Sequence, residues 1–469
     1  MIRKIFFLLL IATISLGAKA GAYRIDVQWK GIKDTTIFLA HYFDTNIYVN
    51  DTIKLDSKGR GVFQGDSLLP QGLYLLYLNG DNFFDFLVGE KQNIKIKTVN
   101  KHLIDSLTIS GATETEAFRQ YQLFLRKQSA AKNKYIDELK SSDSTIATNA
   151  RQKIEQIDKE MNSYLSDAIN SAGNNMFGAF LKAANPAEVP PPNVERNHPQ
   201  YDSIAWFHAY NYRRDHFLEG IDFTDERLLR TPLLKPKLDT YFNKILIQSP
   251  DSIVPQAKKL LQIAEPHKAM YQYLAAFLLN NSVQSKIMGM DAVFVAIADE
   301  VYLSGKATWA DSTQMAKIQE EVFLTRPNLI GNIAPEMLME TIDGETISLH
   351  QLHNDYTIIV FYEYDCGHCK KTVPALYNDV YLKFIDNNID VFAVCMSDDH
   401  EKWAEFVEEH QLAGWHHVWD VPHRSLYRFK YNVRSSPMIY LIDKEKKIIA
   451  KKLDNENLVM LLNTLLNKK

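Results

Sequence analysis

Two cysteines separated by two residues are the side chains in this sequence whose type and spacing best fit a chemical role. They stand in the tetrapeptide Cys366-Gly367-His368-Cys369. Thiols at this spacing can close into a disulfide and open again, and the thiolate is the form that attacks other disulfides. The tetrapeptide therefore predicts reversible thiol–disulfide chemistry.

The segments on either side place the tetrapeptide where a strand passes into a helix. Residues 356–362 are β-branched and aromatic, which predicts a buried strand. Residues 370–384 carry apolar side chains at helical spacing, from Val373 to Phe384. The unpaired N–H groups and the dipole at a helix N-terminus stabilise a thiolate, so the predicted placement suits the chemistry.

Cysteine usage favours an active disulfide over a structural one. The chain has 3 cysteines, and the third, Cys395, ends the apolar stretch 391–394, where a buried free thiol is expected. Exported proteins stabilised by disulfides usually carry more cysteines, spread along the chain. Two cysteines do not supply the about four ligands of a structural zinc site. We therefore expect neither a metal nor a cofactor.

The N-terminus has the layout of a secretory signal peptide. Arg3 and Lys4 precede an apolar run, and a small-x-small site ends at Ala20. The run is short for a membrane span, and no later stretch is long and apolar enough for one. Residues 1–20 are therefore predicted to be a signal peptide cleaved after Ala20, which places the protein in the periplasm or another extracytoplasmic space.

Composition narrows the class of partner. The chain of 469 residues is 46% hydrophobic and 23% charged, as in soluble globular proteins. Without Arg3, Lys4 and Lys19, the mature chain would carry 50 basic and 57 acidic residues, a net charge of −7. A mildly acidic chain disfavours nucleic acid and anionic membrane surfaces as partners.

After the signal peptide, the sequence predicts three regions. Short β runs separated by turn signals over residues 21–110 predict a sandwich-like accessory domain. Helical periodicity over residues 113–325 predicts a helical domain. Alternating strands and helices over residues 328–469 predict an α/β domain with helices on both faces of a sheet. Within it, residues 415–419 fit a loop packed on the sheet and equally a part of the substrate face.

Residues 328–469 resemble a thioredoxin-like fold, more specifically the bacterial extracytoplasmic thiol–disulfide oxidoreductases of the TlpA/ResA type. The motifs that carry the resemblance are Gly331-x-x-Ala334-Pro335, Asp343-Gly344, Cys366-Gly367-His368-Cys369, Pro374, Ser436-Pro437 and Ile442-Asp443. Residues 23–100 are similar to a small β domain of unknown function that often precedes such modules in bacterial envelope proteins. The resemblance implies a multidomain enzyme with a β-rich N-terminal domain, an α-helical middle region and a thioredoxin-like C-terminal domain.

The resemblance also implies roles for individual residues. Cys366 would be the nucleophile and Cys369 the resolving thiol, and Pro437 matches the family's cis-proline, whose loop faces the disulfide. Pro374 would kink the active-site helix. We expect His368 to stabilise the Cys366 thiolate and so to favour the reduced enzyme.

The chain departs from the family at two positions near the motif. Asp365 stands where the family usually has Trp, and its charge would oppose thiolate formation. Val360 stands where thioredoxins have a buried acid. Glu363 is the nearest candidate to relay the proton of Cys369, and an exposed charge without that role is the alternative.

The sequence thus predicts an exported thiol–disulfide oxidoreductase that acts on protein thiols and disulfides and exchanges electrons with a redox partner protein. The direction stays open between a reductase and an oxidase or isomerase. An envelope binding or scaffold protein, with a secondary redox domain, is the alternative from another class. Peroxidase activity is disfavoured, because a peroxidatic cysteine lies alone in its loop whereas this motif carries an adjacent second thiol.

Overall fold

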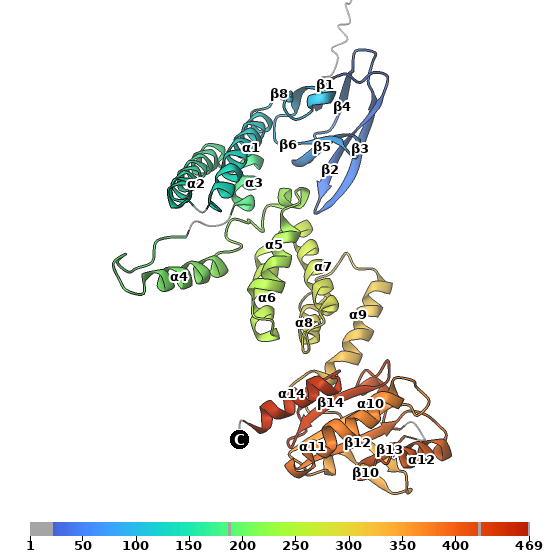
Figure 1. Cartoon of the computed structure of the whole chain (residues 1–469). Coiled ribbons are helices and arrows are strands. Elements are labelled where there is room, and N and C mark those ends of the chain that lie inside the picture. The colour runs from blue at the N-terminus through green and yellow to red at the C-terminus, as the bar shows by residue number, and fades with distance from the viewer. Residues whose placement is uncertain (1–21, 142, 186–188, 421–423, 468–469) are drawn as a thin grey trace, which may run out of the picture. The chain divides into compact units, whose positions relative to one another are not determined.

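The computed structural model describes residues 22–141, 143–185, 189–420 and 424–467. The expected signal peptide, residues 1–20, lies outside the described residues. The chain divides into two compact units, Met1–Tyr241 and Phe242–Lys469 (Figure 1). The division falls inside the stretch expected to be one helical region, so each unit combines a β-sheet structure with helices.

The first unit begins with two four-stranded sheets in the orders β4-β1-β7-β8 and β3-β2-β5-β6. Their strands are β1 (Tyr23–Lys30), β2 (Thr36–Phe43), β3 (Asn46–Lys54), β4 (Arg60–Gly65), β5 (Gly72–Asn79), β6 (Asn82–Val88), β7 (Asn93–Val99) and β8 (Thr108–Ser110). Every second residue of β1 is buried, and Trp29 and Phe63 of one sheet share a core with Tyr74 and Phe86 of the other. Two sheets that enclose one core form the predicted sandwich.

Five helices complete the first unit: α1 (Thr113–Glu138), α2 (Ser144–Ala172), α3 (Met176–Ala184), α4 (Tyr201–Asp215) and α5 (Leu234–Thr240). α1 packs on α2 through the stacked rings of Phe124 and Tyr164, whose centroids are 3.9 Å apart. α4 differs from its neighbours because none of its residues is buried. It stands apart from α1, α2 and α3 (Figure 1).

The second unit opens with four helices: α6 (Pro250–Ala264), α7 (Lys268–Gln284), α8 (Asp291–Ile297) and α9 (Ser312–Thr325). A sheet of seven strands follows, in the order β10-β9-β13-β12-β11-β14-β15. Its strands are β9 (Leu338–Thr341), β10 (Thr346–Ser348), β11 (Tyr356–Tyr362), β12 (Ile389–Cys395), β13 (His416–Trp419), β14 (Met438–Asp443) and β15 (Ile448–Lys451). β11, β12 and β13 run parallel, whereas β14 is antiparallel to β11.

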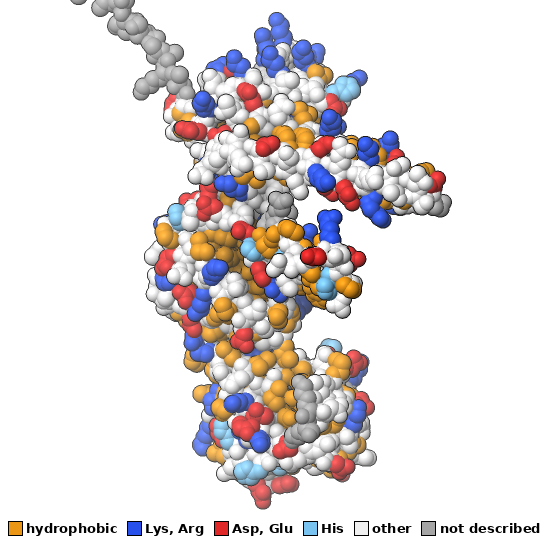
Figure 2. Space-filling model, turned by 90° about the vertical axis from the view of Figure 1, so that its left-hand side faces the viewer, with side chains coloured by type: hydrophobic (Ala, Val, Ile, Leu, Met, Phe, Trp, Pro, Cys, Tyr) orange, Lys and Arg blue, Asp and Glu red, His pale blue; other side chains and the backbone are white. Residues whose placement is uncertain are grey.

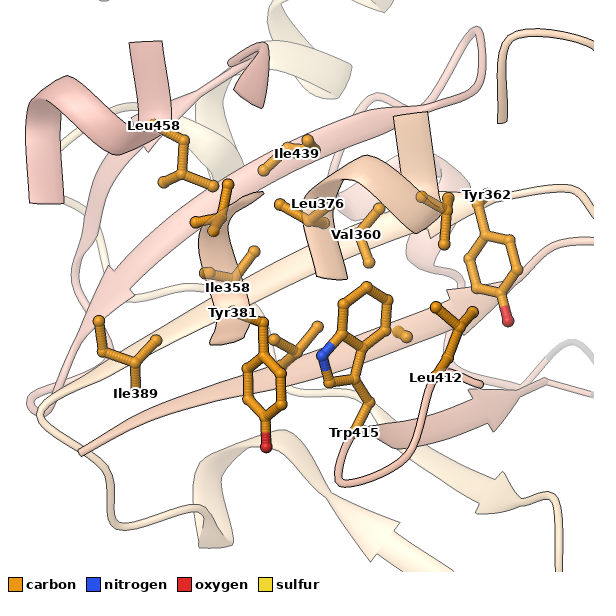
Figure 3. Packing of buried hydrophobic residues seen from close by; sticks show 14 of the residues in the cluster. Ile358, Val360, Tyr362, Leu376, Tyr381, Ile389, Leu412, Trp415, Ile439 and Leu458 are labelled. Atoms are coloured by element: carbon orange, nitrogen blue, oxygen red, sulfur yellow. The ribbon is translucent and has the colours of Figure 1, made fainter. Parts of the chain in front are cut away.

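The sheet of the second unit is buried on both faces. Ile358 and Val360 of β11 belong to the core on one face, and Ile359 and Phe361 belong to the core on the other. A strand covered on both sides carries mostly apolar residues, with Thr357 as the buried exception in β11, which explains the nearly continuous apolar run in the sequence. Figure 3 shows the first core, where Leu376 of the covering helical segment lies over the sheet.

Five helices belong to the α/β region itself: α10 (Cys369–Ala375), α11 (Leu382–Phe384), α12 (His400–Glu409), α13 (Tyr427–Lys430) and α14 (Asn455–Leu466). A π-helical turn, Leu376–Tyr381, joins α10 to α11. Pro374 lies inside α10 and cannot donate the hydrogen bond that an α-helix needs there, and the helix widens just after it. The predicted fold class of β-rich, helical and α/β regions is confirmed.

Acidic and basic side chains alternate over most of the face in Figure 2, and hydrophobic side chains lie among them. This distribution agrees with the small net charge of −4. Among the described residues, no helix is both long and apolar enough to cross a membrane.

Candidate functional site

The cysteine pair lies where the central strand β11 passes into helix α10. β11 ends at Tyr362 and α10 begins at Cys369, whose side chain is buried, while Cys366 is half-buried. The backbone carbonyl of His368 accepts hydrogen bonds from the N–H groups of Lys371 and Thr372, at 3.1 and 2.9 Å. The motif therefore stands at the strand–helix junction that the sequence predicted.

The two thiols differ in acidity. The backbone N–H of Cys369, as a hydrogen-bond donor, is the largest cause that holds the pKa of Cys366 below its usual value of 9.0. Burial raises the pKa of Cys369 to about 11. Cys366 consequently ionises first, and Cys369 keeps its proton when Cys366 has lost its own.

The loop before β14 closes the site from the opposite side. The Ser436–Pro437 peptide bond is cis, and the carbonyl oxygen of Ser436 lies 3.9 Å from the sulfur of Cys366. The hydroxyl of Ser436 donates a hydrogen bond of 2.6 Å to the Oε2 atom of Glu363. This bond ties the proline loop to the end of β11, next to the motif.

Glu363 contacts both halves of the site. Its side chain is half-buried, and its backbone carbonyl accepts a hydrogen bond of 3.3 Å from the N–H of Cys366. Its own backbone N–H lowers the pKa of Cys369 by hydrogen bonding to the thiol, against the larger effect of burial. The backbone of Glu363 thus contacts both cysteines, whereas its carboxylate is engaged by Ser436, and its predicted role as a proton relay stays a prediction.

His368 and Asp365, the two residues expected to set the redox balance, are both exposed. The imidazole of His368 makes no hydrogen bond or ion pair in the part of the chain that the structure describes. The contribution of His368 to the lowered pKa of Cys366 comes from its backbone N–H and is the last of the causes. The predicted role of its side chain stays a prediction.

The third thiol, Cys395, is buried at the end of the strand next to β11. Cys395 ends β12 beside Tyr362 of β11, and burial raises its pKa to about 12. The hydroxyl of Tyr362 accepts a hydrogen bond of 2.9 Å from the indole N–H of Trp403. Val360, at the position of the thioredoxin acid, is fully buried. Within the described residues, no group of three or more His, Cys, Asp or Glu side chains could hold a metal ion.

The structure places the cis-proline loop of Pro437 next to Cys366, and the roles predicted for Cys366, Cys369 and Pro437 stay predictions. Sequence reasoning did not find the hydrogen bond between Ser436 and Glu363. The two residues are separated by 73 positions, so no local sequence pattern predicts the contact between them. The resemblance quoted Ser436 only as the residue before Pro437. The sequence offers one indication of this bond: a serine stands directly before Pro437, and a glutamate stands directly after the central strand.

Two families match parts of the chain. Residues 330–451 match the AhpC/TSA family, and residues 23–118 match a domain of unknown function (DUF4369). Thiol-disulfide oxidoreductase ResA from Bacillus cereus is 24% identical over 122 residues, which cover 26% of this chain and 68% of that protein.

Solved structures match the same C-terminal region. A domain of a possible thiol-disulfide isomerase from Cytophaga hutchinsonii is 32% identical and covers 30% of this chain and 97% of its own, with a TM-score of 0.28. The thioredoxin domain of a thiol-disulfide oxidoreductase from Bacteroides vulgatus is 24% identical and covers 29% of this chain and 96% of its own, with a TM-score of 0.28. The resemblances drawn from the sequence for the two ends of the chain are confirmed.

Proposed function

The chain belongs, through residues 330–451, to the AhpC/TSA family of thioredoxin-like domains and is a thiol–disulfide oxidoreductase, and on that premise we propose that it exchanges disulfides with proteins of the cell envelope. The observation that carries the proposal is the unequal acidity of Cys366 and Cys369. An accessible, acidic thiol suits attack on another protein, and a buried thiol that keeps its proton suits a later step.

The first step forms a bond between two proteins. The thiolate of Cys366 attacks one sulfur of a substrate disulfide, which breaks the substrate S–S bond and forms a mixed disulfide. The other sulfur of the substrate is freed as a thiolate, which takes a proton from solvent while the substrate stays bound to Cys366. The position of the Ser436 carbonyl beside Cys366 supports an extended substrate chain lying along the proline loop.

The second step releases the substrate. Cys369 loses its proton and attacks the sulfur of Cys366, which forms the Cys366–Cys369 disulfide and frees the second substrate thiolate. The substrate gains two electrons and the enzyme loses two. Because burial raises the pKa of Cys369 to about 11, this step needs a base nearby, and the candidate is Glu363, whose backbone N–H is hydrogen-bonded to the Cys369 thiol.

The cycle closes when a dithiol partner protein reduces the Cys366–Cys369 disulfide and is itself oxidised. The same steps in reverse would oxidise a substrate, so the reduction potential of the couple decides the direction. A value near about −270 mV would indicate a reductase, and one of about −180 to −120 mV an isomerase or an oxidase. The signal-like residues 1–20 support action outside the cytoplasm, where protein disulfides form.

Insulin reduction with a dithiol donor tests the proposal on the full mature chain. Cys366→Ser should remove the activity, and Cys369→Ser should accumulate the mixed disulfide, seen by mass spectrometry under non-reducing conditions. Cys395→Ala is the matched control, because it removes a thiol outside the motif and should retain turnover. Full activity in Cys366→Ser, or none in the wild-type chain, would refute the proposal and leave the binding or scaffold alternative.

A further inference from the structure

A cavity of about 770 Å³ lies in the second unit, next to the proline loop. Its lining comes from two sources: the end of α7, the α7–α8 loop and α9 on one side, and the residues before β14 and after β15 on the other. The volume falls in the range of ligand-binding clefts. The helices therefore form a wall that the α/β region alone does not have.

The cavity adjoins the proline loop that contacts Cys366. Pro437 and Ser435 line it, and Ser436 between them places its carbonyl oxygen 3.9 Å from the sulfur of Cys366. A chain that occupies the cavity and continues past Ser436 arrives at the nucleophile. The proline loop thus separates the cavity from the nucleophile by a single residue, Ser436.

The proline loop has free backbone groups at this place. In the part of the chain that the structure describes, the N–H groups of Ser435 and Ser436 donate no hydrogen bond, and the carbonyl of Ser435 accepts none. Free N–H and C=O groups in an extended segment pair readily with another extended chain. The occupant that fits is a polypeptide segment rather than a small molecule.

Charge on the lining is unbalanced. Arg434 is paired with Glu321 through two contacts of 2.7 Å, and Lys451 is paired with Asp291. The two other cations, Lys286 and Lys452, are exposed and form no ion pair among the described residues. Two unpaired ammonium groups attract an acidic side chain of the occupant.

The helical wall also exposes apolar side chains, and a hydrogen bond fixes the loop that carries two of them. Ile287 and Met288 are each 46% exposed, and Val283 is 63% exposed. The sulfur of Met288 accepts a hydrogen bond of 3.4 Å from the backbone N–H of Lys451, which fixes the α7–α8 loop against the edge strand β15. Apolar contact and positive charge thus lie on the same cavity.

We propose that this cavity is the substrate groove of the enzyme and that Lys286 and Lys452 select protein segments with acidic side chains beside the reacting cysteine. The proposal rests on the proposed function, because the groove acts only if Cys366 reacts with protein disulfides. The groove proposal adds a substrate class to the proposed function, and it assigns part of the recognition of the substrate to helices outside the α/β region.

Two synthetic peptides test the selection. Each carries one internal disulfide, and they differ only in having Glu or Lys at the two positions next to one cysteine. The readout is kcat/KM for their reduction by the full mature chain with a dithiol donor. The wild-type chain should prefer the Glu peptide, and the double variant Lys286→Glu, Lys452→Glu should lower its kcat/KM about fivefold while raising that of the Lys peptide.

Matched measurements separate this proposal from the proposed function. Lys447→Glu makes the same charge change on an exposed side chain outside the groove and should leave both peptides unaffected. Reduction of hydroxyethyl disulfide, which is uncharged and small, should be equal in all variants. If the wild-type chain reduces both peptides and the double variant treats them as the wild type does, the groove proposal is wrong and the thiol chemistry stands. If the wild-type chain reduces neither peptide nor hydroxyethyl disulfide, the proposed function fails first.

Discussion

The N-terminal sandwich and the C-terminal sheet both bury apolar strands, but they leave different places for chemistry. The sandwich encloses one core between two sheets. The C-terminal sheet is covered on both faces, so only its edges are left for contact with solvent. Its parallel strands β11, β12 and β13 end side by side, which gathers Tyr362, Cys395 and Trp419 and the thiol motif at one edge. Strand direction, more than burial, decides where reactive groups can meet.

Large core truncations test whether the two structures are independent. Trp29→Ala in the sandwich and Phe392→Ala in the C-terminal sheet each remove a fully buried ring and should cost about 3–5 kcal/mol of unfolding free energy. Calorimetry should show that each change lowers a different transition. Thiol–disulfide exchange should fail at lower temperature only in Phe392→Ala. A single transition lowered by both changes would contradict the independence of the units.

Alkaline pH should weaken the C-terminal sheet before the sandwich. The pKa values of Cys369 and Cys395 are raised to about 11 and about 12, from 9.0 in the unfolded chain. Between these values the unfolded state has released protons that the folded state retains, so stability present below pH 9 is lost as pH rises. Cys366 acts with the opposite sign, since its lowered pKa stabilises the folded state once the thiol ionises.

Denaturant unfolding at about pH 8 and pH 10, followed separately for the two units, measures this loss. The sandwich contains no cysteine, so its unfolding should change less over this interval. Cys395→Ala should reduce the loss in the C-terminal sheet. An equal loss in both units would point to another titrating group.

Hydroxyl deletions should distinguish a functional hydrogen bond from a structural one. Ser436→Ala removes the bond to Glu363, and Ser106→Ala in the N-terminal domain removes the bond of 2.6 Å that its hydroxyl donates to the His102 carbonyl and the bond of 2.8 Å that it accepts from the Val99 N–H. Each should cost about 1 kcal/mol of stability. Only Ser436→Ala should slow insulin reduction, by about threefold to tenfold, because it releases the proline loop.

Glu363→Gln refines that experiment, because the amide oxygen can still accept from Ser436 while the acid–base function is lost. A relay role requires a slower second step with an unchanged first step, measured by rapid quenching of the mixed disulfide. If both steps keep their wild-type rates, the carboxylate only holds the loop.

The smallest effect is expected for His368→Ala. The imidazole is exposed and unpaired in the described structure, so its charge acts on Cys366 through solvent. Titration of the thiolate absorbance should show a raised Cys366 pKa, by about a few tenths of a unit. An unchanged titration would leave the backbone N–H groups as the source of the acidity, and the sequence-based role of the side chain would be wrong.

The sequence predicts elements well where burial leaves a simple pattern. β1 alternates with a period of two and β11 is apolar except for Thr357, and the strand predicted at residues 356–362 agrees with β11. The pattern does not predict β3 (Asn46–Lys54), because none of its residues is buried and only its pairing with β2 reveals it. Residues 416–419 fit a loop in the sequence but form the strand β13, since four residues are too few to show a period.

The same limit applies to the site. Cys366 and Cys369 are close in sequence, and their chemistry follows from type and spacing. The contacts that place Ser436 on Glu363, and the helical wall opposite the proline loop, join residues far apart in the chain. Such contacts depend on how complete elements pack, which a local pattern does not record.

The buried ammonium of Lys451 has a consequence for how the groove works. It donates to the carbonyl oxygen and the Oδ1 atom of Asn328, at 2.7 and 2.9 Å, and pairs with Asp291, so it joins the edge strand to the helical wall. Asp291→Ala would leave this buried charge without its ion pair, at a cost of about 3–5 kcal/mol. The two walls of the groove are therefore tied to each other before a substrate binds, so a bound segment meets a surface that is already assembled.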